Sequence, residues 1–414
     1  MQFSRRSLLS IFGSAAAASA LPVVPARSQA KPSIKLGVLN DLSGPYRDTN
    51  GPNSVACTRQ AITEFNPPSH GFEVELVQAD HQNKPDVASS IARQWFDQGV
   101  DAIIDVPTSS VALAVSQVAR QKDKILLDAS AATTDLTDRQ CSPNTIVWSF
   151  DTYMLAQSNG GASVQAGGRS WVFITADYAF GHILEEHTTA VVRAAGGVVR
   201  GALRYPFPET TDFSSYLQQA QASGAQVLGL ANAGADTVNS IKQAHEFGLS
   251  ETMRIAPLLI FITDVHALGL EMAQGLSCTT SFYWNYNDRT RAFTERVLPH
   301  MANHAYPNMA NAGCYSITMH YLKAAAAMGA VEAKKSGRDT VARMKGIPTD
   351  DDAFGQGRVR ADGRGEFPAY LWRVKKPSES KAPWDLFDLI SITPPAQALH
   401  PLNPKCKFSV VGPA

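Results

Sequence analysis

Two turns rich in hydroxyl-bearing residues carry the clearest chemistry in this sequence. Residues 107–110 (Pro-Thr-Ser-Ser) follow a short apolar run at 100–106, and residues 128–134 (Asp-Ala-Ser-Ala-Ala-Thr-Thr) follow a second apolar run at 124–127. Apolar runs that are bounded by turn residues are typical of strands buried on both faces of a sheet. The two turns are therefore expected to follow neighbouring strands of one parallel sheet.

The position of these turns suits a carboxylate ligand. Residues 111–122 are expected to form a helix, with Ser109 or Ser110 as its N-terminal cap. In a parallel sheet the carboxyl ends of the strands meet at one edge, where helix N-termini present free N–H groups and a partial positive charge. Ser109, Ser110 and Ser130 would lie at that edge, facing an anion. The alternative is that these residues only cap helices, and the presence of two such turns favours the binding edge.

Tyr46 and Arg47 are further candidates for contact with a ligand. They lie on a turn-rich loop at 40–48, which follows the first expected strand. An arginine there could form a charge-assisted, two-pronged pair with a carboxylate. An exposed loop without a binding role is the equally simple alternative.

Composition narrows the function classes. The chain has 414 residues, which suggests at least two domains, and its hydrophobic and charged contents of 44% and 18% are those of an ordinary globular protein. Lys and Arg equal Asp and Glu at 37 each, and no basic stripe stands out, so nucleic-acid binding has little support.

The N-terminus has the pattern of an export signal. Arg5 and Arg6 precede an Ala- and Leu-rich stretch, and small residues follow near positions 28–30. This order predicts a signal peptide over residues 1–30, by either the twin-arginine or the ordinary secretory route. No later stretch is long and apolar enough to span a membrane. The mature protein is expected to be soluble and periplasmic.

Cysteine usage excludes a zinc site but leaves the disulfides open. The five cysteines show no CxxC pair and no zinc-binding spacing. Export permits disulfides, and the odd count leaves at least one thiol unpaired unless a bond forms between chains. The pairing does not follow from the sequence.

Strands and helices alternate in two series, which predicts an α/β fold with two doubly wound, Rossmann-like lobes. In the first series, strands are expected at 34–39, 73–79, 100–106 and 124–127, with helices at 53–64, 85–98 and 111–122. In the second series, strands are expected at 171–175, 197–205, 226–231 and 257–262, with helices at 153–166, about 182–195, 212–222 and about 237–247. Later helices are expected at 288–304 and 312–328, and later strands at 370–374 and 386–392.

Several crossovers should join the lobes. Residues 148–152, 275–284 and 350–368 are the expected crossing segments. The first lobe would comprise residues 31–150 with 280–360, and the second lobe residues 151–279 with 361–392. Residues 393–414 contain five prolines and are expected to form a mostly irregular tail.

An ordered set of short motifs resembles one known family. The set runs across most of residues 31–374, and it comprises Leu42-Ser-Gly-Pro45, Asp80-His-Gln-Asn-Lys-Pro85, Val106-Pro-Thr-Ser-Ser110, Ala129-Ser-Ala-Ala132, Ala176-Asp-Tyr-Ala-Phe-Gly181 and Asp264. With the export signal and the paired lobes, the chain is similar to type I periplasmic solute-binding proteins of ABC importers. The closest group comprises the branched-chain amino-acid receptors and their aromatic-acid-binding relatives.

The resemblance implies a ligand site between the lobes. The family's carboxylate anchor maps onto Ser109, Ser110, Ser130 and, in place of a threonine, Ala132. The family's second-lobe tyrosine maps onto Tyr178. A second tyrosine of the amino-acid receptors falls near Asn232, and the glutamate that meets the ligand ammonium falls on Asp264.

These departures argue against a plain Leu, Ile or Val ligand. Asn83 and Pro107 also lie near the positions of the family's first-lobe disulfide, which is therefore expected to be absent. The resemblance implies a small carboxylate-bearing solute, either amino-acid-like or an aromatic acid. It also implies an inner-membrane ABC permease with its ATPase as partner, a monomer and no cofactor.

Catalytic and metal motifs are missing from the sequence. His182 and His187 are five residues apart on an expected helix, so they point in different directions, whereas a zinc motif needs a spacing of four. No GxSxG, Walker A or GxGxxG sequence occurs. The sequence predicts a transport-associated binding protein. An exported sensor subunit and, less favoured, an amidase or hydrolase on the same fold are the alternatives.

Overall fold

Five parallel strands form the sheet of the first lobe in the computed structural model, which describes residues 31–411. The strand order is β2-β1-β3-β4-β5, which is that of a doubly wound sheet. All neighbours are parallel, and β3 and β4 are fully buried, as the apolar runs predict. The strands are β1 (Ser33–Asn40), β2 (Glu73–Asp80), β3 (Ala102–Ile104), β4 (Ile125–Asp128) and β5 (Thr145–Val147).

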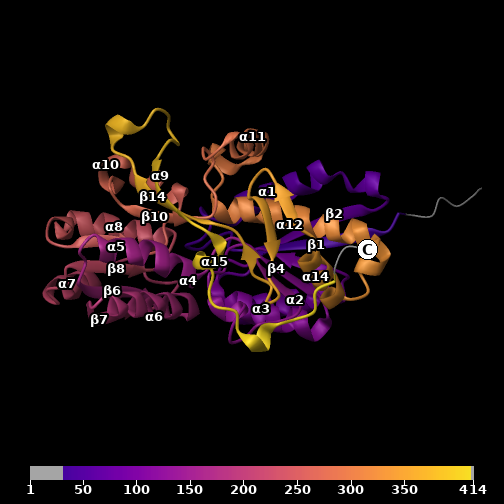
Figure 1. The fold of residues 1–414 in the computed structure, drawn as a ribbon, viewed down its shortest axis with the longest axis horizontal. Helices are drawn as coiled ribbons and strands as arrows, with labels where there is room; N and C mark the ends of the chain where they lie inside the picture. The colour runs from indigo at the N-terminus through magenta and orange to yellow at the C-terminus, as the bar shows by residue number, and fades with distance from the viewer. Residues whose placement is uncertain (1–30, 412–414) are drawn as a thin grey trace, which may run out of the picture. The chain divides into compact units, whose positions relative to one another are not determined.

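Helices cover both faces of this sheet (Figure 1). Because side chains alternate between the faces of a strand, Leu36 and Ile104 pack into the core under α1 and α12, whereas Ile103 and Leu126 pack under α2 and α3. The helices of this lobe are α1 (Gly51–Phe65), α2 (Pro85–Asp97), α3 (Ser109–Lys122), α11 (Asp288–Val297), α12 (Met309–Met328), α13 (Ala330–Ala333) and α14 (Gly337–Gly346).

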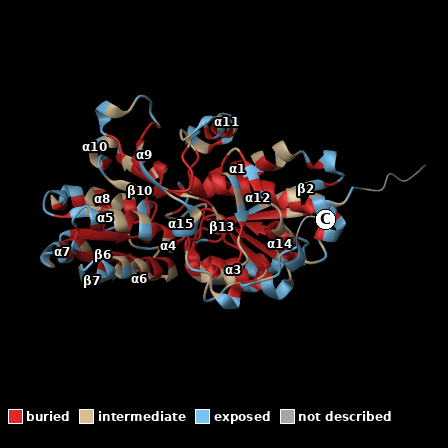
Figure 2. Cartoon of the chain, in the orientation of Figure 1, coloured by how far each residue is buried: buried red, intermediate tan, exposed pale blue. Residues whose placement is uncertain are grey.

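Four parallel strands in the order β7-β6-β8-β9 form the sheet of the second lobe. They are β6 (Ser170–Ala176), β7 (Val198–Tyr205), β8 (Val227–Ala231) and β9 (Arg254–Pro257). The helices are α4 (Thr152–Leu155), α5 (Gly161–Gln165), α6 (Ala179–Ala194), α7 (Ser214–Ala222), α8 (Ala235–Glu246), α9 (Ile262–Leu268) and α10 (Leu270–Ala273). Figure 2 shows the inner strands of both central sheets buried, whereas the outer faces of the helices and parts of the edge strands β2 and β7 are exposed.

Two small antiparallel sheets lie where the chain returns between the lobes. The sheet β10-β14-β15 packs on the second lobe, where Trp372 joins its apolar core. The sheet β11-β12-β13 lies with the first lobe, and Arg364 beside β13 bridges to Val147 of β5. The strands are β10 (Ser277–Thr280), β11 (Thr349–Asp351), β12 (Gly355–Val359), β13 (Gly365–Glu366), β14 (Ala369–Val374) and β15 (Phe387–Thr393).

The structure corrects several element boundaries. The strand predicted at 257–262 lies at 254–257 and ends at Pro257. The apolar residues that follow Pro257 lead to the cleft and to the start of α9. β5 was not predicted as a strand, and the helix predicted at 153–166 is interrupted by a π-helical turn at Ala156–Gly160. The segment 350–368 contains parts of three short strands. The predicted signal peptide lies outside the described residues.

One disulfide fastens the C-terminal tail to the first lobe. Cys141 and Cys406 are bonded, whereas Cys57, Cys278 and Cys314 are buried free thiols. The tail is otherwise mostly irregular, with a short α-helix, α15 (Pro395–Ala398), and a 3₁₀ turn at Pro404–Cys406.

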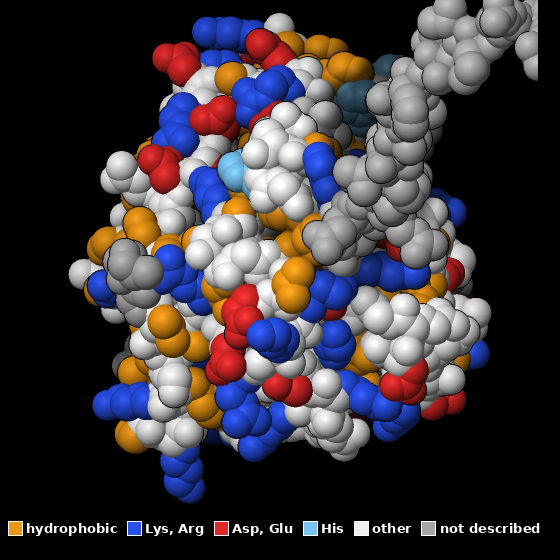
Figure 3. Space-filling model, turned by 90° about the vertical axis from the view of Figure 1, so that its right-hand side faces the viewer, with side chains coloured by type: hydrophobic (Ala, Val, Ile, Leu, Met, Phe, Trp, Pro, Cys, Tyr) orange, Lys and Arg blue, Asp and Glu red, His pale blue; other side chains and the backbone are white. Residues whose placement is uncertain are grey.

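Surface charge is mixed. Figure 3 shows Lys and Arg side chains interspersed with Asp and Glu over one end of the protein. No helix in the described part of the chain has the length and hydropathy needed to cross a bilayer.

Candidate functional site

The carboxyl ends of the two central sheets face a small pocket between the lobes. The first lobe contributes Tyr46, Asn50, Pro107, Ser130 and Ala132 to its lining, and the second contributes Tyr178, Phe180, Ala233, Leu259 and Phe261. Four predicted site residues thus come together here, namely Tyr46, Ser130, Ala132 and Tyr178. The other lining residues, most of them apolar, were not predicted, because apolar side chains at strand ends look like core residues in a sequence.

Direct contacts between the lobes hold this pocket nearly closed. The Tyr46 and Tyr178 hydroxyls are hydrogen-bonded to each other, and Phe207 stacks on Tyr178 with ring centroids 4.4 Å apart. The Ala235 N–H donates to the Pro45 carbonyl at 3.1 Å. The cavity measures only about 20 Å³, close to the space that one water molecule needs. A ring-bearing ligand therefore enters only when the two tyrosines separate.

The Tyr46 loop is positioned by a carboxylate beneath it. Asp41 is buried and accepts hydrogen bonds from the Gly44 N–H at 2.6 Å, the Tyr46 N–H at 2.9 Å and the Asn83 side-chain amide at 2.8 Å. The amide carbonyl of Asn83 accepts in turn from the Thr108 hydroxyl. This hydrogen bond joins the two segments that the family's first-lobe disulfide would join. Burial raises the pKa of both Tyr46 and Tyr178, so both phenols remain protonated donors at neutral pH.

A buried carboxylate lies directly behind Ser130. Asp105 follows β3 with φ of +55° and accepts from the Asn40 amide at 2.8 Å, the Asn50 amide at 3.2 Å and the Ser130 hydroxyl. Burial raises the pKa of Asp105, although these hydrogen bonds oppose the shift. The hydroxyl proton of Ser130 is thus donated to Asp105, and the next N–H of the turn, that of Ala131, donates to the Asp128 carboxylate at 3.1 Å.

Ser109 lies just behind the pocket wall. Pro107 lines the pocket and α3 begins at Ser109, two residues later. The Ser109 hydroxyl is buried and has no hydrogen-bond partner among the described residues, and Ser110 is partly buried. The first hydrogen bond of the helix runs from the Ala112 N–H to the Thr108 carbonyl at 2.8 Å, so the earlier N–H groups remain available to an anion.

Besides Ser109 and Ser110, three further predicted site residues lie outside the pocket lining. Arg47 is exposed and pairs with its neighbour Asp48 at 3.0 Å. The Asn232 side chain is buried and bonds to Thr237 and Ser240 at the start of α8. Asp264 is also buried, and its carboxylate accepts from the Phe261 N–H at 2.9 Å in a capping interaction.

Comparison with known proteins establishes the family. The family model described as periplasmic binding protein matches residues 33–381. A crystal structure of a periplasmic binding protein from Burkholderia mallei is 44% identical, with 89% of this chain and 96% of that chain covered and a TM-score of 0.85. The chain belongs to the periplasmic binding protein family.

Two further structures extend the comparison of this periplasmic binding protein. A branched chain amino acid ABC transporter ligand-binding protein from Burkholderia xenovorans is 39% identical over 89% of this chain and 97% of that chain, with a TM-score of 0.75. A solute-binding protein from Rhodopseudomonas palustris in complex with p-hydroxybenzoic acid is 21% identical over 87% and 97%, with a TM-score of 0.76, and it shows the shared fold. A search of the curated proteins finds no match.

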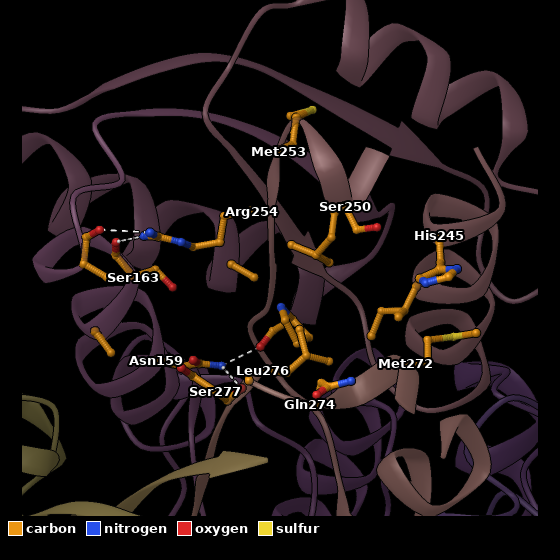
Figure 4. A pocket seen from close by; sticks show the side chains of 17 residues that line it. Asn159, Ser163, His245, Ser250, Met253, Arg254, Met272, Gln274, Leu276 and Ser277 are labelled. Atoms are coloured by element: carbon orange, nitrogen blue, oxygen red, sulfur yellow. Dashed lines mark hydrogen bonds between the residues drawn. The ribbon is translucent and has the colours of Figure 1, made fainter. Parts of the chain in front are cut away.

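A larger cavity lies entirely within the second lobe of this periplasmic binding protein (Figure 4). It measures about 380 Å³ and lies between the π-helical turn, β9 and α10. Its main polar side chains are engaged in holding the wall together. The Asn159 amide donates to the Pro257 and Ser277 carbonyls, and the Arg254 guanidinium donates to the Ser163 and Ala166 carbonyls. We therefore place the candidate site in the smaller interlobe pocket.

The histidine pair at 182 and 187 does not form a metal centre. His182 bonds to Asp177 at 2.7 Å, whereas His187 lies against Tyr153 and His400. Within residues 31–411, no three His, Cys, Asp or Glu side chains are placed to hold a metal ion together.

The carboxyl of Asp264 should make this periplasmic binding protein less stable as pH rises from about 4 to 7. Burial raises the pKa of Asp264 to about 7, although the Phe261 N–H opposes the shift. The folded state thus binds this proton more tightly than the unfolded state, so stability falls as pH rises through this window. Asp264→Asn removes the titration and keeps an acceptor for Phe261. We expect the loss of unfolding free energy between pH 4.5 and 7.5 to be smaller in the variant by about 1–3 kcal/mol.

Urea unfolding at both pH values measures this difference. Burial also raises the pKa of Asp236 to about 7, but Asp236 titrates in both proteins and cancels from the comparison. Equal pH dependence in the variant and the wild type would show that Asp264 ionises in the folded protein as easily as in the unfolded chain.

Proposed function

We propose that this periplasmic binding protein captures a small aromatic carboxylic acid between its lobes and delivers it to an inner-membrane ABC permease with its ATPase. The observation that carries the proposal is the chemistry of the pocket lining. It contains the rings of Tyr46, Tyr178, Phe180 and Phe261, and none of its residues bears a charge. Such a lining suits a flat apolar ring that is fixed at one end by polar groups.

The start of α3 is the proposed carboxylate anchor. It combines the unpartnered Ser109 hydroxyl with the free N–H groups of the first helical turn. Backbone donors and the helix dipole stabilise an anion without a cationic side chain. Ser130 also lines the pocket, but its hydroxyl is bonded to Asp105 and the Ala131 N–H of the same turn is bonded to Asp128, so the start of α3 carries the anchor. At the other end, the Tyr46 and Tyr178 phenols could bond a ring substituent once they separate.

The lining favours an aromatic acid over an amino acid. A zwitterion brings an ammonium group, which needs a carboxylate or several acceptors when it is buried. The residue that maps onto the family's ammonium partner, Asp264, lies outside the lining, and burial raises its pKa to about 7. The relative from Rhodopseudomonas palustris, which binds p-hydroxybenzoic acid, supports the same class of ligand. The ABC transporter named for the Burkholderia xenovorans relative supports the transport role.

Thermal unfolding in the presence of chosen solutes tests the proposal. Benzoate and p-hydroxybenzoate should each raise the Tm of the mature protein by several degrees, because a ligand at a hundred times its Kd adds about 2.7 kcal/mol to stability. p-Hydroxybenzamide and L-leucine should not raise it, since one lacks the charge and the other brings an unpaired ammonium. A shift with L-leucine and none with the acids would overturn the aromatic-acid assignment.

Ser109→Ala probes the anchor with the same acids. A hydrogen bond to a charged group is worth about 1.5–3 kcal/mol, so binding should weaken by at least about tenfold. Ser116→Ala, on the same helix but bonded to Thr145 in the core, serves as the matched control. If the Ser109→Ala variant binds these acids as tightly as the wild type, the ligand carboxylate is held elsewhere.

A further inference from the structure

Four cationic side chains from three segments line one cavity on the first lobe. Arg120 lies at the end of α3, Arg338 and Lys345 lie on α14, and Lys407 lies on the C-terminal tail. The cavity measures about 330 Å³, and Pro143, Ala342, Phe408 and Ser409 complete its lining. The lining contains no carboxylate, so the cavity concentrates positive charge on a protein whose net charge is zero.

This cavity is separate from the interlobe pocket. α3 begins beside the pocket at Ser109, and Arg120 lies eleven residues further on, about 16 Å along the helix axis. Lys407 and Phe408 also lie beyond residue 381, where the match to the family model ends. The cavity therefore owes part of its lining to a segment outside the shared family region.

The charges around the cavity are poorly neutralised. Within the described part of the chain, none of the four cations forms an ion pair within 4.0 Å. Two carboxylates act on the cluster from outside the lining, Asp123 on Arg338 and Asp362 on Lys345, and both also bond other groups. Asp123 accepts from the Asn144 amide and from the backbone N–H of Arg338, and Asp362 pairs with Arg360 at 2.6 Å.

Lys345 is the buried member of this cluster. Lys345 is only 6% exposed. Its ammonium donates to the Ala361 carbonyl at 2.9 Å and lies 5.1 Å from the centre of the Phe408 ring. An ammonium has three N–H donors, so this contact leaves donors unused. Burial lowers the pKa of Lys345 to about 8, although the charge of Asp362 opposes the shift.

We propose that this cavity is a binding site for a phosphate group, held by Arg120, Arg338, Lys345 and Lys407. Guanidinium groups bond phosphate oxygens in pairs, and ammonium groups add point charges. A dianionic phosphate matches this excess of charge better than a single carboxylate does. The phosphate group can belong to a free anion, which approaches a double charge near neutral pH, or to a phospholipid head group, whose phosphodiester carries a single charge.

The disulfide makes the site conditional on the tail. Cys406 immediately precedes Lys407 and is bonded to Cys141, and the Val411 N–H donates to the Ala342 carbonyl at 3.0 Å. These two fastenings hold Lys407 and Phe408 against α14. Without the disulfide, the cavity loses one cation and one wall, while the interlobe pocket keeps all of its lining.

Titration of the mature protein with inorganic phosphate and with pyrophosphate tests the proposal. We expect saturable binding of one anion per chain at low ionic strength, weakened at least tenfold in the variant Arg338→Ala with Lys407→Ala. Both residues are exposed, so the fold should survive their replacement. The matched control, Lys335→Ala with Lys376→Ala, removes the same charge from exposed positions outside the cavity and should bind like the wild type. Cys141→Ser with Cys406→Ser should weaken binding in the same direction.

Vesicles distinguish the two sources of phosphate. If the head group is the ligand, the wild type should sediment with phosphatidylglycerol vesicles more than with phosphatidylcholine vesicles. The Arg338→Ala, Lys407→Ala variant should then stay in the supernatant. Binding of the soluble anions alone identifies a free phosphate. The proposal is overturned if neither probe binds, or if the cavity variant and the matched control bind equally well.

Discussion

Gly234→Ala should weaken the binding of p-hydroxybenzoate about a hundredfold and enlarge the radius of gyration of the ligand-free protein. Gly234 lies at the start of α8 with φ of +59°, and a Cβ there would come within 2.5 Å of the Pro45 carbonyl on the other lobe. That contact and the neighbouring Ala235–Pro45 hydrogen bond exist only when the lobes are closed. Overpacking costs about 1–3 kcal/mol and the lost bond about 1 kcal/mol.

A second glycine separates closure from backbone strain. Gly248, on the same lobe, has φ of +67°, and a Cβ there would meet nothing within 4 Å. Gly248→Ala places an alanine in the left-handed region, a milder backbone strain than at Gly234 with its ψ of −135°, and it introduces no interlobe clash. Its ligand affinity should match that of the wild type. Scattering and calorimetric titration measure the two effects. If Gly234→Ala and Gly248→Ala behave alike, the Pro45 contact does not govern closure.

Arg364→Met should lower the unfolding free energy by about 3–5 kcal/mol, because it leaves a buried carboxylate without its partner. The Arg364 guanidinium lies 2.9 Å from the Asp151 carboxylate, and both side chains are at most 2% exposed. It also donates to the Gly365 carbonyl at 3.0 Å. The pair joins two of the segments that cross between the lobes, so its loss affects the crossing region directly.

Two comparisons test the origin of this loss. Asp151→Asn with Arg364→Met should recover part of the stability, since the amide still accepts from the Met154 N–H, as Asp151 does at 2.8 Å. Arg289→Met removes a half-exposed arginine that pairs with Asp352 at 2.9 Å, and should cost less than about 1 kcal/mol. Urea unfolding measures all three. A loss below 1 kcal/mol in Arg364→Met would mean that water or neighbouring groups compensate Asp151.

The alternation of strands and helices was predictable because it depends on local pattern. Apolar runs such as 100–106 and turn residues after them indicate buried parallel strands, and the doubly wound fold follows from their order. Two strands of the central sheets escaped this reasoning. β5 is only three residues long, and β9 merges into an apolar run that continues to Ile262, where periodicity cannot show where the strand ends.

The site was predictable only where polar residues follow strands. Ser130 was found from its turn and Tyr178 from the resemblance to the family, whereas Phe261 and Leu259 look like core residues until the lobes are brought together. The donation from Ser130 to Asp105 depends on tertiary packing, because 25 residues separate the two along the chain. The pairing of Arg47 with Asp48 depends only on adjacent residues. That neighbour was visible in the sequence and makes Arg47 a weaker candidate for binding a ligand.

The fastened tail turns the second lobe into a tethered body. The tail leaves the second lobe at Thr393, and the Arg360 guanidinium on the first lobe already bonds the His400 carbonyl at 2.8 Å. The seven residues from Pro394 to His400 can extend to about 25 Å at most. The disulfide further on keeps the far end from sliding when the lobes rotate. The length of the tail segment between the two lobes thus limits how far they can open. This limit does not depend on the strength of any contact in the cleft.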